Sequence, residues 1–344
     1  MPADNANASK TPTGPRRSLS GIKSTGSPHL GNYLGMIRPA IALQETHEAF
    51  YFVADYHALT TERDPEAMRR STLEVTATFL ACGLDPSRGA FFRQSDVPEV
   101  TELSWLLSCI TTMGELERGH AYKARAASGE AGTAVHGLFA YPVLMAADIL
   151  IYDSHVVPVG KDQVQHVEMA RDMAKRFNHH FGETFVIPEA QTDAAVMTIP
   201  GIDGRKMSKS YKNGIDIFQP RKKLKKRLMQ VVTDSTPLEA PKNPDGDNVI
   251  ALYRFFASDA EVAEMEANYR RGGYGYGHAK VALFEAMDAH LGPMRERYDA
   301  LMANPSELED VLQAGARKAR AVAQEVMGRA RARCGYPTRP VQMS

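Results

Sequence analysis

The chain has 344 residues, with 41 basic and 41 acidic side chains, so its formal net charge is zero. Hydrophobic residues make up 43% of it and charged residues 24%, which is ordinary for a water-soluble globular protein of about two domains. The balanced charge excludes any argument for a nucleic-acid partner from a global basic excess, so only local clusters can indicate one.

The N-terminus and the cysteines indicate the compartment. Residues 1–17 are polar and lack the apolar stretch of a secretory signal, so we expect a disordered leader. The cysteines, Cys82, Cys109 and Cys334, lie far apart without a CxxC pair, which argues against a disulfide framework and a structural metal site. No apolar run approaches the length of a membrane-spanning helix. We expect a cytoplasmic protein with no membrane contact.

The first half of the chain alternates apolar runs with helical patterns. The run FYFV at 50–53 is typical of a strand buried on both faces of a parallel sheet. In chain order we expect strands at 18–22, 50–53, 89–96 and 156–160, and helices from residue 29 onward and at 68–82, 103–113 and 162–177. This alternation predicts an α/β fold with a parallel sheet.

The strand pattern stops after about residue 214. The segments that follow read as helices separated by Pro- and Gly-rich stretches, at 221–232, 247–257, 260–270, 278–302 and 308–333. We therefore expect four parts: the leader at 1–17, a catalytic nucleotide-binding domain at 18–214, a helical domain at 215–310, and a C-terminal helix and tail at 311–344 that packs back on the catalytic domain.

The stretch SPHLGN at 27–32 follows an expected strand and opens a helix. A helix N-terminus presents free N–H groups and a positive dipole end to phosphate, and His29 adds a donor there. The spacing fits neither a Walker A loop nor a GxGxxG fingerprint. An ordinary helix cap explains the stretch equally well.

The stretch GRKMSKSYKNG at 204–214 gathers charge and hydroxyl groups between glycines. Two of its lysines, Lys206 and Lys209, could act as point charges on phosphate oxygens, with the hydroxyls of Ser208 and Ser210 beside them. A loop of this kind can close only when a nucleotide is present. A solvated basic loop is the alternative.

Taken together, these stretches resemble a known family. Residues 206–210, Lys-Met-Ser-Lys-Ser, resemble the second signature of class I aminoacyl-tRNA synthetases, and residues 29–32, His-Leu-Gly-Asn, resemble the first, commonly His-Ile-Gly-His. Residues 54–60, 114–123, 137–178 and 231–235 resemble tryptophanyl-tRNA synthetases of the bacterial type. The resemblance extends from about residue 18 to 335. It implies a class I synthetase Rossmann-like parallel sheet with a C-terminal all-helical domain that carries the anticodon-binding surface.

One helix face indicates an amino-acid pocket. Tyr141, Met145 and Asp148 follow at i, i+4 and i+7, so an aromatic ring, a thioether and a carboxylate could line a slot for a flat, apolar ring with one N–H. The pattern alone leaves open a structural role for Asp148 in the core, since buried carboxylates need a partner. The resemblance implies instead that Asp148 accepts the indole N–H of tryptophan. It also implies substrate contacts for Val157, Val159, Gln163, His57 and Leu19.

The resemblance implies an ATP site as well, with Mg²⁺ carried by ATP and no metal site on the protein. The residues implied in ATP binding are Lys23, Ser24, Thr25, Gly31, Asn32, Gly160, Lys161, Asp162, Val196, Lys206, Met207, Ser208, Lys209 and Ser210. The catalytic residues would be Lys206, Lys209 and Arg125 on pyrophosphate, assisted by Ser208 and His29. Three positions depart from the common family pattern: Lys23 replaces Gln, Arg125 replaces Lys, and Leu19 replaces Phe.

The implied activity is ATP-dependent conversion of L-tryptophan to tryptophanyl-adenylate and transfer to tRNA(Trp), with release of AMP and pyrophosphate, by a homodimer. A tyrosyl-tRNA synthetase shares the fold and is the nearest rival. A small-molecule nucleotidyltransferase is less consistent with the second signature and the long helical half. A non-catalytic RNA-binding paralogue is disfavoured by the intact signatures.

Two clusters of basic residues stand out on this neutral chain. Residues 221–227 carry six cations in seven positions. The second cluster lies on the last expected helix and comprises Arg317, Lys318, Arg320, Arg329, Arg331 and Arg333. Such clusters indicate contact with a phosphate backbone, and solvated helix faces explain them equally well.

Overall fold

The computed structural model describes residues 15–23, 28–119, 122–123, 135–160, 163–192, 199–208 and 210–338. Within them a sheet has the strand order β3-β2-β1-β4-β5, and every pair of neighbours is parallel. The strands are β1 (Arg17–Ile22), β2 (Glu48–Val53), β3 (Gly89–Arg93), β4 (Val156–Pro158) and β5 (Glu189–Gln191). The expected α/β fold with a parallel sheet is confirmed.

Helices surround this sheet in the first half of the chain. A continuous helical segment follows residue 29, and its middle part, η1, has π-helical geometry. The elements are α1 (Leu30–Asn32), η1 (Tyr33–Ile37), α2 (Arg38–Ala42), η2 (Leu43–Glu45), α3 (Asp55–Ala58), α4 (Pro65–Ala81), η3 (Gln94–Asp96), α5 (Glu99–Ser108), α6 (Met113–Glu117), α8 (His136–Leu150) and α9 (Val164–Phe181).

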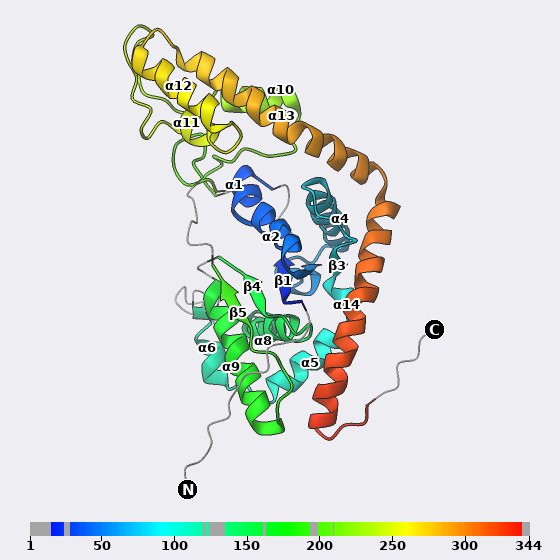
Figure 1. The fold of residues 1–344 in the computed structure, drawn as a ribbon. Coiled ribbons are helices and arrows are strands. Elements are labelled where there is room, and N and C mark those ends of the chain that lie inside the picture. Colours follow the sequence, from blue (N-terminus) through cyan, green and yellow to red (C-terminus); the bar gives the residue numbers. More distant parts are fainter. Residues whose placement is uncertain are drawn as a thin grey trace.

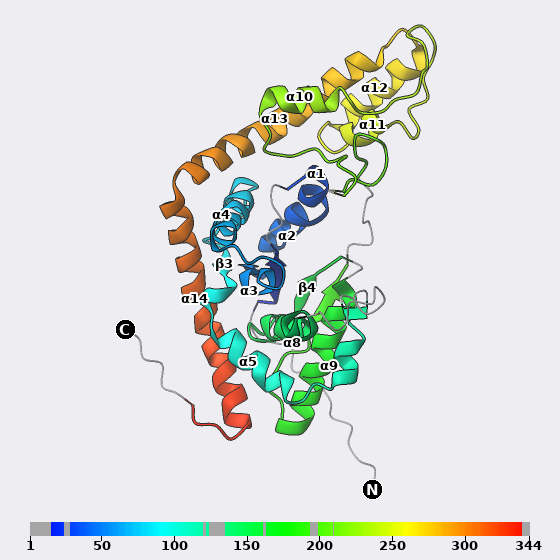
Figure 2. The same cartoon turned by 180° about the vertical axis from the view of Figure 1, so that it is seen from behind.

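Helices also make up the second half, with no strand among the described residues after 214. They are α10 (Arg221–Leu228), α11 (Asn248–Tyr253), α12 (Asp259–Arg271), α13 (Tyr276–Ala303) and α14 (Pro305–Arg333). Helices α10, α11, α12 and the start of α13 lie at one end of the molecule, and α14 runs back along the sheet (Figures 1 and 2). Within the described ranges no helix combines the length and apolarity that crossing a membrane requires.

Two wrong boundaries and one missed strand each have a local reason. The strand expected at 89–96 ends at Arg93, because residues 94–96 turn into η3. Helix α5 begins at Glu99 instead of 103, since Pro98 occupies the N-cap and two acidic residues favour the first turn. Strand β5 was missed because it is a short edge strand without an apolar run.

The sheet is buried on both faces, as the run FYFV predicts. In β2, Phe50 and Phe52 belong to a core cluster shared with α5, α8 and α9. The alternate residues, Tyr51 and Val53, belong to a second cluster that continues through α4 into α10, α11 and α13. Because side chains alternate along a strand, this single strand contributes to both cores.

The basic residues of α14 anchor that helix to the sheet half. Lys318 Nζ donates to the backbone carbonyl of Gly89 at 2.9 Å, and Arg320 pairs with Glu99 at 2.8 Å. Arg329 pairs with Asp153 at 2.6 Å, and Arg331 pairs with Glu102. From the sequence, these four cations could either contact phosphate or form a solvated face. In the structure they bind other groups of the protein.

Close packing of α14 on β3 depends on a glycine in the helix. A Cβ atom on Gly315 would lie 1.9 Å from the carbonyl oxygen of Phe91. Gly328, in the same helix, has nothing within 4 Å of the corresponding position. The two glycines form a matched pair for testing this contact.

We predict that Gly315→Ala lowers the free energy of unfolding by about 1–3 kcal/mol or more, because backbone atoms must separate to admit the methyl group. Gly328→Ala should raise it by about 0.5–1 kcal/mol, since alanine favours the helix. Denaturant unfolding followed by circular dichroism measures both. Equal effects of the two substitutions would contradict the proposed packing.

Candidate active site

A cavity of about 450 Å³ opens at the carboxyl ends of β1 and β4. These neighbours lie where the strand order reverses, the place where open α/β sheets bind ligands. The strands and the residues directly after them contribute one part of its lining: Leu19, Gly21, Lys23, Phe52, Ala54, Val157, Pro158, Val159 and Gly160. Helices and turns contribute the other part: Met36, His57, Thr60, Leu138, Tyr141, Met145, Asp148, Ile149, Gln163 and His166. Its size suits an amino acid or a nucleoside.

A buried carboxylate lies at the inner end of this cavity. The residue, Asp148, is only 1% exposed. Gln94 Nε2 donates to its two oxygens at 2.8 and 2.9 Å, and His57 Nε2 lies 2.9 Å from Oδ2. Burial raises the pKa of Asp148, and the hydrogen bond from His57 opposes that shift. An ionised Asp148 requires a proton on His57 Nε2, because a carboxylate only accepts hydrogen bonds.

The ends of neighbouring strands bring these partners together. His57 lies in α3, directly after β2, and Gln94 is the first residue after β3. The backbone N–H of Tyr56 donates to Gln94 Oε1 at 3.1 Å, which points the amide NH₂ group at Asp148. The sequence analysis missed Gln94. A polar residue that directly follows a buried strand was the available signal.

A second group of hydrogen-bonded polar side chains, besides the one around Asp148, lines the cavity. The Tyr141 hydroxyl lies 2.6 Å from His166 Nε2, and His166 Nδ1 lies 3.0 Å from Gln163 Oε1. Burial raises the pKa of Tyr141, so its hydroxyl stays protonated and available as a donor. The expected helix face of Tyr141, Met145 and Asp148 does line one cavity, together with Val157 and Val159 from the strand side.

The two signature stretches contact each other. His29 caps α1, with its Nδ1 accepting from the backbone N–H of Asn32 at 3.2 Å. The backbone N–H of Leu30 donates to the carbonyl of Ile215 at 2.7 Å, and that of Gly31 lies 3.3 Å from the Met207 sulfur. The start of the helix after β1 is therefore joined to the stretch at 204–214, which we term the lysine-rich loop, although more than 170 residues separate them in sequence.

The lysine-rich loop is built around a buried asparagine, Asn213, which is 1% exposed. Its Oδ1 accepts from the backbone N–H of Ser208 at 2.8 Å, and its Nδ2 donates to Asp203 at 2.8 Å and to the Lys206 carbonyl at 3.1 Å. This leaves the Lys206 side chain exposed. The sequence analysis did not single out Asn213, because its partners depend on how the loop folds.

Helix α10 holds the far end of this loop. Arg227 donates from Nη2 to the carbonyl of Lys212 at 2.6 Å and from Nε to the carbonyl of Gly214 at 3.0 Å. Lys212 has a φ of 51°, in the left-handed region that non-glycine residues rarely adopt. The guanidinium group thus stabilises a strained turn next to the second signature.

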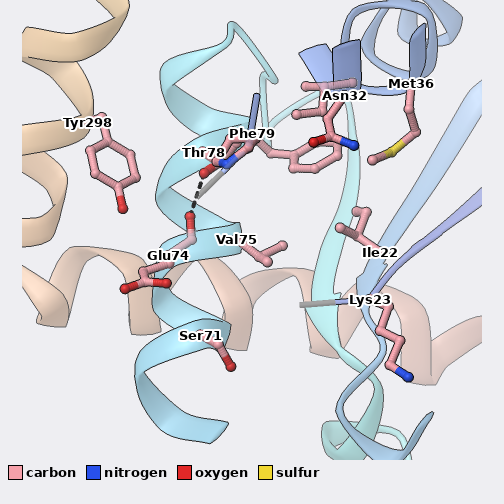
Figure 3. Close-up of a pocket in the computed structure, with 12 residues that line it drawn as sticks. Ile22, Lys23, Asn32, Met36, Ser71, Glu74, Val75, Thr78, Phe79 and Tyr298 are labelled. Atoms are coloured by element: carbon pink, nitrogen blue, oxygen red, sulfur yellow. Dashed lines mark hydrogen bonds between the residues drawn. The ribbon is translucent and has the colours of Figure 1, made fainter. Parts of the chain in front are cut away.

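A smaller cavity of about 50 Å³ adjoins the large one and shares Lys23 and Met36 with it. Figure 3 shows Glu74 and Tyr298 at one end, with Lys23 and Met36 at the other. The ring of Tyr298 stacks on Phe218, with centroids 4.1 Å apart. A space of this size holds one or a few water molecules, so room for a substrate lies in the large cavity.

Some expected site residues lie outside the described ranges, and their positions stay untested. They are Ser24, Thr25, Arg125, Lys161, Asp162, Val196 and Lys209. Among the expected ATP ligands that are described, Lys23 and Gly160 line the large cavity, and Lys23 and Asn32 line the small one. Among the residues with described positions, no group of three or more His, Cys, Asp and Glu side chains is arranged to hold a metal ion.

Comparison with known proteins places this site in a family. The family model described as tRNA synthetases class I (W and Y) matches residues 10–292. The tryptophan–tRNA ligase of Rhodopirellula baltica is 53% identical over 319 residues, which cover 93% of this chain and 99% of that protein. That of Pseudomonas aeruginosa is 52% identical over 319 residues, covering 89% of this chain and 71% of that protein.

A solved structure extends the similarity to three dimensions. The crystal structure of tryptophanyl-tRNA synthetase from Campylobacter jejuni, complexed with ADP and tryptophan, has a TM-score of 0.88 and 47% identity, and the match covers 93% of this chain and 99% of that one. The chain described here therefore belongs to the class I tRNA synthetases of the W and Y group, and within them to the tryptophan–tRNA ligases.

Proposed function

We propose that this protein is an ATP-dependent tryptophan–tRNA ligase, which forms tryptophanyl-adenylate and transfers the tryptophanyl group to tRNA(Trp). The observation that carries the proposal is the buried carboxylate of Asp148 at the inner end of a largely apolar cavity, in a chain that shares about half of its residues with tryptophan–tRNA ligases. The products of the two steps are pyrophosphate and AMP. The protein binds tryptophan and a nucleotide, as its relative from Campylobacter jejuni does.

Selection of tryptophan is assigned to Asp148. Its carboxylate accepts the indole N–H, and the hydrogen bonds from Gln94 and His57 keep it ionised and oriented despite its burial. Leu19, Met145, Val157 and Val159 provide apolar contacts for the ring. Tyr141 and Gln163, which also line the cavity, are assigned to orient the substrate ammonium group.

Activation requires the tryptophan carboxylate to attack the α-phosphate of ATP in line, with pyrophosphate as the leaving group. No protein nucleophile is needed, so catalysis consists of positioning and of stabilising the charge that develops on phosphate oxygens. We assign that charge stabilisation to Lys206, Lys209 and Arg125, with Ser208 and His29 as hydrogen-bond donors. The remaining expected ATP contacts are Lys23, Ser24, Thr25, Gly31, Asn32, Gly160, Lys161, Asp162, Val196, Met207 and Ser210.

Mg²⁺ is proposed to enter bound to the phosphates of ATP, because this ion keeps several water ligands and commonly binds proteins through substrate phosphates. The proposal extends to a homodimer in the cytoplasm, with a catalytic part at 18–214 and an anticodon-binding helical part at 215–310. Resemblance to the family supports these further assignments.

We predict that exchange of labelled pyrophosphate into ATP, without tRNA, depends on tryptophan and not on tyrosine. Tyrosine is the informative competitor, because the matched family includes enzymes for both amino acids. Exchange that depends on tyrosine would be consistent with the assigned fold but would overturn the assignment of the pocket to tryptophan. Absence of exchange with either amino acid would favour a non-catalytic RNA-binding protein.

Asp148→Ala should raise the KM for tryptophan roughly 10- to 150-fold, the loss expected for a hydrogen bond to a charged group. The KM for ATP should stay within about threefold, because Asp148 is assigned to the indole N–H and to no atom of ATP. Pyrophosphate exchange at varied tryptophan and ATP measures both constants. Exposed Asp172 supplies the control, since Asp172→Ala removes a carboxylate outside the cavity. An unchanged KM for tryptophan in the Asp148 variant would refute the assignment.

Lys206→Ala, alone and with Lys209→Ala, should lower kcat for adenylate formation by roughly 10²-fold or more, on the scale of a lost transition-state charge interaction. The matched control is Arg205→Ala, because the adjacent Arg205 already pairs with Asp203 at 2.7 Å. Single-turnover adenylate formation, measured by rapid quench, separates this step from tryptophan binding. A similar loss in the Arg205 variant would indicate that loop structure, rather than the Lys206 charge, is responsible.

A further inference from the structure

Helix α10 carries two kinds of basic residue. Its eight residues, RKKLKKRL, include six cations and no acid. Leu224 and Leu228 are fully buried against α13 and belong to the core of the helical half. These two leucines fix the orientation of the helix, so the cations divide into those beside the buried face and those opposite to it.

Three of the cations serve the fold. Arg221 pairs with Asp288 at 2.6 Å, and its guanidinium group lies over the ring of Phe284. Lys225 Nζ lies 5.5 Å from the centre of the same ring. Arg227 holds the carbonyls at the end of the lysine-rich loop. Each of these residues flanks the leucines, and each has a partner within the protein.

The other three, Lys222, Lys223 and Lys226, form what we term the outer lysine face. They lie at i, i+1 and i+4, opposite the buried leucines on the helix, and all are exposed. In the described part of the chain no hydrogen bond, ion pair or ring contact joins the side chain of any of them to another residue. The contrast with α14 is direct, because Lys318, Arg320, Arg329 and Arg331 there bind carboxylates or carbonyls of the protein.

This arrangement costs helix stability. Lys222 and Lys226 form a like-charge i, i+4 pair, which destabilises a helix by a few tenths of a kcal/mol. Lys222 and Lys223 also lie in the first turn, where the helix dipole disfavours cations, and no acidic residue there offsets them. Folding alone therefore does not account for the outer lysine face, whereas an anionic partner would remove the repulsion.

We infer that the outer lysine face binds the sugar–phosphate backbone of tRNA, an assignment that rests on the proposed function. Lysines act as point charges on phosphate oxygens, and release of counterions from the RNA favours such contacts. Helix α10, which carries this face, lies in the helical half and packs its opposite side on α13 (Figures 1 and 2). Through Arg227 the same helix is bonded to the lysine-rich loop, so RNA on this face passes close to the second signature.

Backbone contacts position an RNA but do not read its sequence. The triple variant Lys222→Gln, Lys223→Gln, Lys226→Gln should therefore weaken binding of tRNA(Trp) and of other tRNAs by similar factors. We expect the Kd for tRNA(Trp) to rise at least tenfold at 50 mM KCl. The slope of log Kd against log salt should fall by roughly two to three, one phosphate contact per lysine. Fluorescence anisotropy of end-labelled tRNA transcripts between 50 and 200 mM KCl measures both quantities.

Two controls separate charge from structure. The first control, the triple variant Lys222→Arg, Lys223→Arg, Lys226→Arg, keeps the positive charge. It should retain both the affinity for tRNA and the salt dependence of the Kd. The second control, the triple variant Arg63→Gln, Arg69→Gln, Lys175→Gln, makes the same charge change at exposed sites outside both basic clusters and should leave the salt slope nearly unchanged. Because Gln and Lys have similar helix propensities, the α10 triple variant should unfold thermally at or slightly above the wild-type temperature.

Pyrophosphate exchange, which needs no tRNA, distinguishes failure of this inference from failure of the proposed function. Wild-type protein that shows no tryptophan-dependent exchange would overturn the function, while anisotropy would still report whether α10 binds RNA. Normal exchange with an unchanged tRNA Kd and salt slope would overturn the inference alone. A triple variant that lost exchange together with tRNA binding would also overturn it, because the lysines would then support the catalytic loop.

Discussion

The contact between the start of α1 and the lysine-rich loop is the constraint on which the rest of the structure depends. Two backbone N–H groups, of Leu30 and Gly31, bond to Ile215 and Met207, and the side chains of Leu30, Met207 and Ile215 enter the core cluster that continues into the helical half. The two signature stretches are thereby brought together after the carboxyl end of β1. Without this contact the loop would have no fixed position relative to the sheet, and exposed lysines alone would not form a site.

A second constraint is the burial of a carboxylate, Asp148, inside a largely apolar core. Burial raises the pKa of Asp148, and removing an ionised group from water is costly unless hydrogen bonds replace the lost hydration. Gln94 and His57 supply those bonds from the ends of two neighbouring strands. The parallel order of the sheet brings these residues to one edge, so the topology itself provides the groups that stabilise the charge.

The sequence predicted the architecture well where local pattern and global fold agree. The apolar run of β2 predicted a strand covered on both faces, and the i, i+4, i+7 spacing predicted that Tyr141, Met145 and Asp148 share one helix face. Prediction failed where an assignment depends on distant partners. Gln94 acquires its role from a residue 54 positions later, and Asn213 from the fold of its own loop. Strand β5 exists because β4 offers it an edge to pair with.

The basic clusters show most clearly which assignments the sequence alone leaves undecided. The basic clusters on α10 and α14 looked alike in sequence, and both were compatible with phosphate binding or with a solvated surface. In the structure the two clusters differ in what surrounds them. Helix α14 crosses β3 beside acidic side chains and backbone carbonyls, which bind most of its cations. Helix α10 instead exposes half of its cations on the side that faces away from the protein. The lysines opposite the buried face of α10 lack a partner within the described chain. Since Lys222 and Lys223 lie in the first turn, where the helix dipole disfavours cations, and Lys222 repels Lys226, a polyanion outside the protein is the simplest account of these lysines.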